Sequence, residues 1–580
     1  MDPSPSTSSR ALVIWHGYLL GATGSNIYTH HLVDSWVRAG HDVVLACQEP
    51  DPSRHPAIQE AVWLEGGTGG EPARVRERQT IRERREGEGR CTMVVPDLGG
   101  VLPVYVLDRY EGFEVVRVPG LDRERLDSYL AAHAAAMRWV LDEHPEVGGV
   151  LVNHASPLPQ ALAPVLRDAG VPFAVKVHGS ELEYALAEDD TLVAPAAAAL
   201  GQAASVLVGS AHIERRTREL LGDASVDGRV AIVPPGVDLD RFRPVEQADS
   251  ARREEHARLV DELRTRCAAQ TAGRDRSQRE QVEQLVARIG GDAEVASLLL
   301  PALAQLHGSY EERHVEQPAA ERIEAIDPVN TRMLVYVGKL IPQKGVHLLL
   351  AALPEVVAEH PNVQLVIAGF GPLRDALEAM LTAMVRRDGA ALDVLADRMG
   401  ELSGEGGSAL PHLRAFLDAR RDAGTLGSWL EQASRSRVDE HVTWLGLVDH
   451  GVLAHLFPLA EASVVPSVLA EAFGMVAAEA AACGCVPVVA NHSGLASAAD
   501  VIEHNGVEPI RFDALDTATA VDDLVRVLPG EIETRLPYWL VARPEALRRP
   551  GVAAFVRALH ERMAEVRPAL LGLGASATGS

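Results

Sequence analysis

The sequence has few cysteines and few aromatic residues, and each shortage restricts the fold. Five cysteines among 580 residues are an odd number in a long chain, so no disulfide framework is expected. Cys483 and Cys485 form the one close pair, and with His492 as the nearby candidate ligand they are too few for a zinc site. Buried thiols at a helix-to-strand junction are the better interpretation. Aromatic residues make up 4% of the chain, so aliphatic side chains and alanine must supply most of the core.

Basic residues are also few: the chain has 55 lysines and arginines against 81 aspartates and glutamates, which gives a net charge of −26. This balance argues against a general nucleic-acid binder, whose affinity for phosphate backbones comes from clustered lysine and arginine, so no nucleic-acid partner is expected. It also gives little attraction to anionic lipid. No run of eighteen apolar residues occurs, so no stable membrane insertion is expected. The composition, with 47% apolar residues, predicts a globular, acidic, cytoplasmic protein.

Short apolar runs alternate with glycine-containing loops and helical patterns in both halves of the chain. Residues 11–15 predict a strand, a glycine-rich loop follows, and a helical pattern then covers about 26–39. A strand, a loop, a helix and a second strand form a βαβ unit, which implies a parallel sheet. The same pattern returns from Met333 onward. We therefore expect an α/β fold of two Rossmann-like domains facing across a cleft, with the ligand at the carboxyl ends of the strands.

Three charged or polar stretches interrupt this pattern, and we interpret them as insertions in loops of a regular scaffold. They cover about residues 50–100, 245–328 and 381–440. Their charge-rich helices offer surfaces for oligomerisation or protein contacts. The expected order of parts is a disordered leader at 1–10, an N-terminal α/β domain at 11–244, the charged helical insertion or linker at 245–328, a second α/β domain at 329–545, and a C-terminal helix and tail at 546–580.

Two lysines lie in a loop directly after a predicted strand and before a predicted helix. Lys339 and Lys344, within the segment 338–345, place two ammonium groups beside a helix N-terminus. The free amides and the dipole of the helix attract an anion and the lysines neutralise it, so this loop suits a diphosphate. It is not a Walker A loop, because the Gly-x4-Gly-Lys-Ser/Thr pattern is absent. Two surface lysines at a helix start remain the alternative.

Two glutamates stand eight positions apart after another predicted strand. Glu471 lies near the start of a helix and Glu479 lies within that helix. At about 100° per residue their offset is about 80°, so both carboxylates can address one side. Carboxylates accept hydrogen bonds from pairs of sugar hydroxyls, and the helix start offers free amides to a sugar or phosphate oxygen. A capping glutamate and an exposed helix glutamate are the alternative.

Together these motifs make the chain resemble the family 4 glycosyltransferases of the GT-B fold. The Glu-x7-Glu element matches at Glu471 and Glu479, with Phe473-Gly474 between them, and the family's Gly-Arg-Leu…Lys-Gly element matches over 338–345. One departure is Lys339, where the family usually has arginine, so a point charge replaces a guanidinium fork. The other matching segments follow in the family's order between about residues 11 and 505, at 40–43, 178–179, 233–242, 368–372 and 445–448.

The resemblance assigns roles to the domains and to these positions. It implies that the Rossmann-like domain at 11–244 lies on the acceptor side, that the domain at 329–545 binds the donor, and that the C-terminal helix at 546–580 crosses back to the first domain. It implies that Lys339 and Lys344 hold the donor diphosphate, and that Glu471 binds hydroxyls of the donor sugar. Glu479 would bind the ribose hydroxyls, and His178 would contact a hydroxyl of the donor sugar. The implied catalytic residues are His178, Lys339, Lys344 and Glu471; the implied donor-binding residues are Gly24, Ser25, Gly338, Gly371, Leu447 (through its backbone, to the base), Ala472, Phe473, Gly474, Met475 and Glu479; the candidates for the acceptor are His16, Asn26 and His154.

The implied reaction is transfer of a hexosyl group from a UDP or GDP sugar, with retention of configuration, to a soluble small molecule or a saccharide. Neither a cofactor nor a metal ion is expected. Asp238 and Asp240 have the spacing of a metal-binding Asp-x-Asp motif but lie in the segment that closes the first domain, so we interpret them as structural. A dehydrogenase is disfavoured because Gly-x-Gly-x-x-Gly is absent. The open alternatives are a sugar phosphorylase or synthase of the same fold, and a catalytically silent nucleotide-sugar-binding scaffold.

Overall fold

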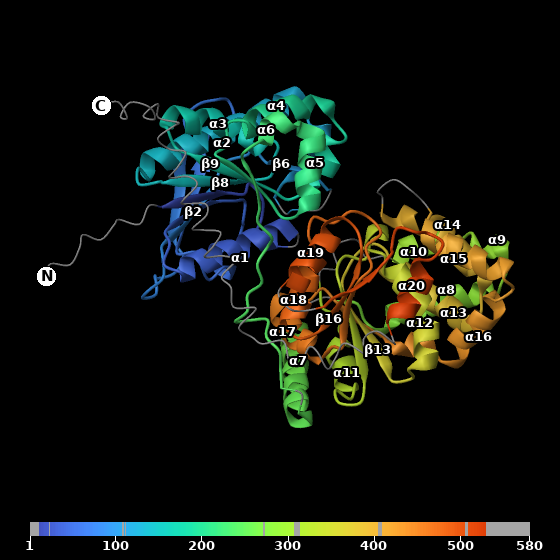
Figure 1. The fold of residues 1–580 in the computed structure, drawn as a ribbon. Helices are drawn as coiled ribbons and strands as arrows, with labels where there is room; N and C mark the ends of the chain where they lie inside the picture. The colour runs from blue at the N-terminus through green and yellow to red at the C-terminus, as the bar shows by residue number, and fades with distance from the viewer. Residues whose placement is uncertain are drawn as a thin grey trace, which may run out of the picture. The chain divides into compact units, whose positions relative to one another are not determined.

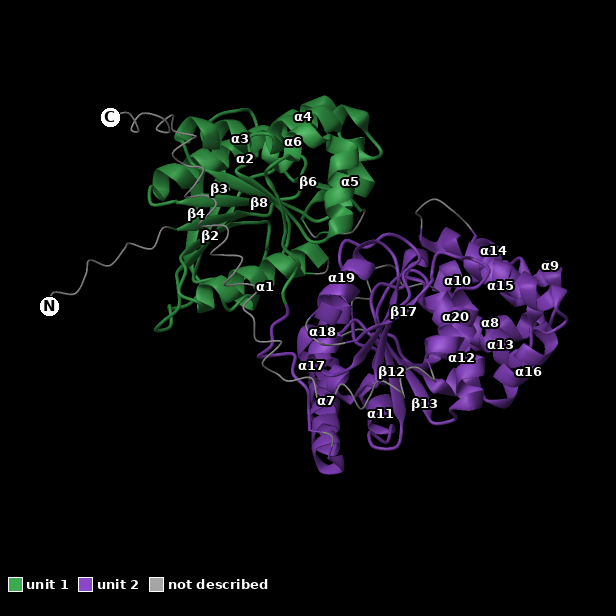
Figure 2. Ribbon diagram, viewed as in Figure 1, with its two compact units in different colours: residues 1–236, 550–580 green, residues 237–549 purple. Residues whose placement is uncertain are grey.

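The chain divides into two compact α/β units, and the boundary falls between Gly236 and Val237 (Figure 2). Each unit is built on its own sheet. The predicted leader at 1–10 and the predicted C-terminal helix at 546–580 lie outside the described residues. The structure, a computed structural model, describes residues 11–21, 24–106, 110, 112–246, 248–270, 273–306, 314–403, 409–504 and 508–528.

A nine-stranded sheet is the core of the first unit, with the strand order β11-β10-β9-β8-β1-β2-β5-β3-β4. Its neighbouring strands are parallel except for β3 and β4. Its central strand, β1, is buried along its whole length, as a continuous apolar run predicts for a parallel strand. The strands are β1 Leu12–Trp15, β2 Val43–Ala46, β3 Glu60–Glu65, β4 Arg74–Thr80, β5 Cys91–Val95, β8 Gly149–Asn153, β9 Phe173–Val177, β10 Ser205–Val208 and β11 Val230–Ile232, and a separate two-stranded sheet holds β6 Val101–Val104 and β7 Glu114–Arg117.

Helices connect these strands in the order that the βαβ pattern predicts. The helical pattern expected at 26–39 is α1, which ends at Arg38, shortly before Gly40 turns the chain with a φ of +86°. A π-helical turn, η3 Leu182–Leu186, follows β9. The helices of the first unit are α1 Gly24–Arg38, α2 Arg123–Glu143, α3 Leu158–Ala169, α4 Asp190–Leu200, α5 Ala211–Leu221 and α6 Asp223–Val226.

The stretch at 50–100 is part of the first sheet, and the expectation that it is an insertion in a loop was wrong. Its strand β5 pairs with β2 and β3 in parallel, and β4 adds an antiparallel edge strand. The stretch was interpreted as a loop because of its charged residues; all seven residues of β4 are exposed, and four of them are charged. Charged side chains on an edge strand discourage pairing with other chains.

A six-stranded parallel sheet is the core of the second unit, with the order β14-β13-β12-β15-β16-β17. Side chains of β12 alternate between its two faces: Leu334 and Tyr336 join one apolar cluster, whereas Met333 and Val335 join the other. The two Rossmann-like units confirm the predicted fold class. The strands are β12 Arg332–Val337, β13 Val363–Ala368, β14 Val442–Gly446, β15 Ala462–Val465, β16 Val486–Ala490 and β17 Ile510–Phe512.

The second and third charged stretches are helical, and they pack against each other. Helix α8 lies against α13, and α10 lies against α14, so these parts of the two stretches form one helical layer over a face of the second sheet (Figure 1). Helices α7, α11, α17 and α18 cover the other face. The helices of the second unit are α7 Asp249–Ala269, α8 Arg276–Ile289, α9 Ala293–Ala296, α10 Leu299–Leu306, α11 Ala319–Glu324, α12 Val346–Glu359, α13 Arg374–Arg386, α14 Gly389–Arg398, α15 Pro411–Asp422, α16 Leu426–Arg435, α17 His450–Leu456, α18 Met475–Ala482, α19 Ser493–His504 and α20 Ala520–Val527.

Several motifs of the sequence have a structural explanation. Asp238 accepts hydrogen bonds from the backbone N–H of Asp240 and of Arg241, at 3.1 and 3.3 Å, and so stabilises a turn. Cys483 and Cys485 are free buried thiols between α18 and β16, as predicted, and burial raises the pKa of both. Among the described residues, no helix is long and apolar enough to cross a membrane. Within the same ranges, no group of three or more His, Cys, Asp or Glu side chains is placed to hold a metal ion.

Candidate functional site

Lys344 and Glu471 meet at the carboxyl edge of the second sheet, although 127 positions separate them in the sequence. Lys344 ends the short turn η4 (Pro342–Lys344) after β12, and Glu471 lies in the loop after β15. The Lys344 ammonium donates a hydrogen bond to Glu471 Oε1, and Ser467 Oγ donates another to the same oxygen at 2.5 Å. The two residues that the sequence singled out in separate motifs therefore form one ion pair.

Gly345 allows these two loops to approach. Its φ is +68°, and a Cβ at this position would stand 1.9 Å from the carbonyl oxygen of Pro466. A backbone hydrogen bond of 2.9 Å from the Val468 N–H to the Gln343 carbonyl ties the loops together directly. Glycine is therefore required both for the left-handed conformation and for the close contact.

Glu471 is held as a carboxylate. Burial raises the pKa of its carboxyl group, but the Lys344 ammonium and hydrogen bonds from Lys344 and Ser467 outweigh this effect, so the pKa lies below its ordinary value. Its backbone is fixed as well, because its N–H donates to Ser493 Oγ at 2.9 Å and its carbonyl accepts from the Gly494 N–H at 2.8 Å. The pair thus presents a fixed carboxylate for hydroxyl groups and an ammonium for an anion.

Helix α18 begins just after Glu471 and adds amide groups to the same loop. Gly474, which precedes the helix, has a φ of +101° that favours glycine. The first N–H groups of a helix have no partner within the helix, and its N-terminus carries a partial positive charge. The predicted donor-binding residues Ala472, Phe473, Gly474 and Met475 lie together at this helix start.

The loop that carries Lys339 packs against the loop after β13. Gly338 begins this loop, and the Leu340 N–H donates to the Phe370 carbonyl at 2.8 Å. A Cβ on Gly371 would stand 2.7 Å from the Leu340 carbonyl oxygen, so this glycine is needed for the contact. The half-buried Lys339 is therefore carried on a loop whose backbone is fixed.

Glu479 and Leu447 have partners that the sequence did not indicate. His450 Nε2 lies 3.2 Å from Glu479 Oε1, so the two predicted glutamates bind different side chains. The Leu447 N–H donates to the His314 carbonyl at 3.0 Å. If the backbone at Leu447 reads a base, it must do so through groups other than this N–H.

A chain of hydrogen bonds joins four polar residues at the carboxyl edge of the first sheet. His178 Nε2 donates to Asn153 Oδ1 at 2.9 Å, and Asn153 Nδ2 donates to His16 Nδ1 at 3.1 Å. His16 Nε2 donates in turn to Asn26 Oδ1 at 2.9 Å. This network fits neutral imidazoles that carry their proton on Nε2. Burial lowers the pKa of His16 to about 3 and, together with nearby positive groups, lowers that of His178 as well.

The three residues proposed for the acceptor are internal supports. His16, Asn26 and His154 are each at most 2% exposed, and their side chains bind other residues of the unit. This differs from the expectation that they face an acceptor. His178 is half-buried, and Gly24 is exposed at the start of α1 with Ser25 next to it.

Lys176 is a buried cation on β9 that the sequence analysis missed, two positions before His178. It is 2% exposed, and its Nζ donates to the Val233 carbonyl at 2.9 Å and lies 5.3 Å from the ring centre of Tyr28. Burial lowers its pKa to about 7, against an opposing effect of the Glu181 carboxylate. Glu181, also missed, is fully buried.

Replacing Lys176 with methionine should stabilise the first unit most at acidic pH. The folded pKa of about 7 lies below the ordinary 10.5, so folding releases a proton between these values and wild-type stability rises with pH across that window. At pH 6 the ammonium is charged in both states and its burial cost is fully present. We expect K176M to raise the free energy of unfolding there by about 1–2 kcal/mol, as a hydrophobic replacement of a buried ion does. Urea unfolding at pH 6 and pH 9 measures the difference, which should shrink with pH; a constant difference would contradict this account.

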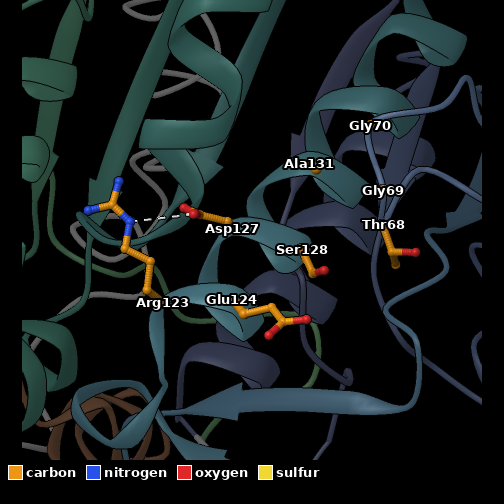
Figure 3. A pocket seen from close by; sticks show the side chains of 8 residues that line it. All are labelled: Thr68, Gly69, Gly70, Arg123, Glu124, Asp127, Ser128 and Ala131. Carbon is orange, nitrogen blue, oxygen red and sulfur yellow. Dashed lines mark hydrogen bonds and ion pairs between the residues drawn. The ribbon is translucent and has the colours of Figure 1, made fainter.

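The first unit also has an open groove of about 550 Å³ between α2 and the loop after β3 (Figure 3). The loop residues 68–70 form one side, and Glu124, Asp127 and Ser128 of α2 form the other. Arg123 Nε lies 3.5 Å from Asp127 Oδ2 at the start of the helix. The lining includes none of the predicted site residues.

Two family models match the chain and together cover more than half of it. The model described as Glycosyltransferase Family 4 matches residues 22–241, and the model described as Glycosyl transferases group 1 matches residues 320–387 and 428–524. The unmatched residues between and within these matches fall largely in the second and third charged stretches.

Curated relatives match over part of their length. A glycogen synthase of Mycobacterium tuberculosis (strain ATCC 25618 / H37Rv) is 30% identical over 188 residues, which are 32% of this chain and 32% of the relative. D-inositol 3-phosphate glycosyltransferase 2 of Catenulispora acidiphila is 30% identical over 199 residues, 34% of this chain and 36% of the relative. The chain thus spans about a third of the length of these relatives. Among solved structures, sucrose-phosphate synthase from Thermosynechococcus elongatus aligns over 97% of this chain and 99% of its own, with a TM-score of 0.45 and 16% identity.

The family matches agree with the sequence motifs and with the structure of each unit. The first model covers most of the unit that holds His178, and the second covers the segments that hold Lys344 and Glu471. Both units are Rossmann-like, with the motif residues in loops at the carboxyl ends of parallel strands. The chain belongs to the family 4 glycosyltransferases of the GT-B fold.

Proposed function

We propose that the protein transfers a hexosyl group from a nucleotide diphosphate sugar to a soluble small-molecule or saccharide acceptor, with retention of configuration and without a metal ion. The observation that carries the proposal is the pairing of Lys344 with Glu471 beside the start of α18. An ammonium and a helix N-terminus favour a diphosphate, and a fixed carboxylate accepts hydrogen bonds from sugar hydroxyls. The names of the curated relatives support sugar transfer as the class of reaction.

The chemical difficulty is the departure of the diphosphate from the anomeric carbon. Negative charge grows on the phosphate as the sugar becomes oxocarbenium-like, and Lys339, Lys344 and the amides of α18 would stabilise that charge. We infer that the acceptor oxygen attacks on the face from which the diphosphate leaves. The bond from the anomeric carbon to the phosphate oxygen breaks, the bond to the acceptor oxygen forms, and the departing phosphate oxygen takes the acceptor's proton.

Glu471 is proposed to position the donor sugar rather than to attack it. Its carboxylate already binds Lys344 and Ser467, and its main chain is held by Ser493 and Gly494. A carboxylate anchored in this way suits the binding of hydroxyls better than movement toward a carbon atom. His178 is proposed to contact a hydroxyl of the same donor sugar.

A thermal-shift panel of UDP, GDP and ADP sugars tests the donor class. A ligand that binds only the folded protein stabilises it by about 2.7 kcal/mol at a concentration of 100 Kd. We expect one nucleotide series to raise the melting midpoint by about 5 °C, a shift in keeping with that energy for a unit of this size. The matching nucleoside monophosphate is the control, because it lacks the second phosphate. If no nucleotide sugar shifts the midpoint, the proposed donor is wrong.

A sugar synthase or phosphorylase of the same fold is a second candidate, favoured by the match to a glycogen synthase. A phosphorylase would release the donor sugar onto inorganic phosphate, whereas a synthase would extend a saccharide. Release of nucleoside diphosphate, measured with and without phosphate and with an oligosaccharide acceptor, separates these activities from transfer to a small molecule. Binding of a nucleotide sugar without turnover on any acceptor would indicate a silent scaffold.

A further inference from the structure

Glu181 joins the two loops that follow β8 and β9 in the first unit. Its Oε1 accepts hydrogen bonds from the backbone N–H of His178 and of Ala155, at 2.9 and 3.2 Å. Its Oε2 accepts from the Gly179 N–H at 3.0 Å and lies 3.2 Å from His154 Nδ1. One fully buried carboxylate therefore binds three main-chain amides and one imidazole across two loops.

The residues that Glu181 binds have backbone conformations that need support. His154 has a φ of +70°, in the left-handed region that residues other than glycine rarely adopt, and Gly179 has a φ of +104°. Burial raises the pKa of the Glu181 carboxyl, but nearby His154 and the hydrogen bonds lower it to a net value below the ordinary one. An ionised carboxylate in this place accepts at both oxygens, which a neutral side chain cannot do as well.

Glu181 has no direct route to a substrate, because its carboxylate is fully buried and bound on both sides. His178, which it holds through the main chain, is half-buried, and its ring is held from the other side by Asn153. The imidazole of His178 is thus fixed at two points, and Glu181 supplies the main-chain point. Because Glu181 fixes the position of His178 and does not itself reach a ligand, its loss should change the geometry of the reacting groups more than the affinity for a ligand.

We propose that Glu181 is a positioning residue for sugar transfer, which fixes the loops of His154 and His178 so that His178 is in place in the transition state. This inference rests on the proposed function, in which His178 contacts the donor sugar. It predicts that loss of the carboxylate lowers kcat while leaving the affinity for the nucleoside diphosphate unchanged, because the proposed diphosphate-binding residues belong to the second unit.

Glu181→Gln is the direct test. Its amide oxygen can still accept from the His178 and Ala155 N–H groups, but its NH₂ would face the Gly179 N–H, donor against donor. We expect kcat to fall by about 10- to 100-fold, the size that a small misplacement near a reacting centre produces. The Kd for the nucleoside diphosphate of the preferred donor, measured by calorimetry, should stay within about twofold of wild type.

Glu183→Gln is the matched control, because Glu183 lies in the same turn and pairs with Arg216 at 2.7 Å near the surface. It should leave kcat unchanged. Glu181→Asp keeps the charge, but its side chain is too short to bind both loops at once, so it should also lower kcat. It serves as the test if Glu181→Gln does not fold. An E181Q or E181D enzyme that folds and turns over at the wild-type kcat would overturn the inference.

A double-mutant cycle with His178→Ala separates positioning from general stabilisation. If Glu181 acts through the His178 side chain, E181Q should cost less than about threefold in kcat in the H178A background, against 10-fold or more in wild type. Additive losses would show that Glu181 acts elsewhere and would overturn the inference while the proposed transfer reaction stands. If the wild-type enzyme transfers sugar from no donor, the proposed function itself fails, and the positioning role fails with it.

Discussion

Replacing Lys344 with methionine should lower kcat/KM for sugar transfer by about 100- to 1,000-fold, the loss that follows removal of a group aimed at developing charge. Methionine keeps the length of the side chain but removes the ammonium that binds Glu471 and that we propose neutralises the departing diphosphate. K344R should retain more activity because it keeps the charge, although a planar guanidinium does not reproduce the contact of an ammonium. Steady-state kinetics with the preferred donor measures both variants.

The pH profile of kcat/KM adds a second readout to this prediction. Burial raises the pKa of Glu471 and the Lys344 ammonium lowers it, so this pKa should rise in K344M. The acid limb of the profile should therefore move to higher pH in K344M and stay near its wild-type position in K344R. Arg435→Met, which removes a surface partner of Glu431, is the control and should change neither quantity. Wild-type kcat/KM in K344M would contradict the role of Lys344.

The strands and loops that carry the site could be predicted because each strand is a short apolar run that ends at a distinctive loop. Residues 11–15 were expected as a strand, and β1 covers Leu12–Trp15. Parallel strands bring their carboxyl ends to one edge. Residues from distant motifs therefore converge, and Lys344 and Glu471 meet although nothing in their local sequences indicates the contact.

The buried polar supports could not be predicted in the same way. A periodic pattern identifies apolar faces, but it gives no reason for a charge within a buried strand, so Lys176 and Glu181 were passed over. One signal was available for Lys176: the chain has three lysines among its 55 basic residues, and the other two are Lys339 and Lys344. All other basic residues are arginines, and each of the three lysines lies in or just after the carboxyl end of β9 or β12. An ammonium is a compact point charge, whereas a guanidinium is a planar fork, so the rare choice of lysine at these positions was a usable signal.

The packing of the charged helices also escaped prediction, because their charges suggested a solvated surface. Part of that charge is buried in a network around Arg374 at the start of α13. Its Nε donates to Glu316 at 2.7 Å, its Nη1 donates to Glu378 at 2.9 Å, and its guanidinium lies 3.8 Å from the ring centre of Trp444. Glu316 belongs to the second charged stretch, so the network connects that stretch to α13 and β14 of the second unit.

Replacing Arg374 with alanine should lower the free energy of unfolding of the second unit by about 3–5 kcal/mol, because it removes one partner from each of two buried carboxylates and also removes the cation over the ring. Glu316 keeps Arg322, and Glu378 keeps Arg274 and the more distant Arg279, but each loses its contact with Arg374. Urea unfolding, followed as the transition of the second unit, measures the loss. Arg398→Ala, which breaks the exposed pair with Glu401, is the control and should leave the unfolding transition near its wild-type position.

The same substitution should also affect the proposed donor site, through the main chain. Glu316 lies two positions after His314, whose carbonyl accepts the Leu447 N–H, so loss of the Arg374–Glu316 contact should loosen the segment that lies along the end of β14. If Leu447 reads the base, R374A should weaken nucleotide binding more than R398A does. If R374A lowers the free energy of unfolding by less than about 1 kcal/mol, the remaining arginines compensate the buried carboxylates fully, and the network does not depend on Arg374. If R374A is destabilised but binds the nucleotide with unchanged affinity, the segment bonded to Leu447 has loosened without changing nucleotide binding. Base recognition would then lie away from Leu447.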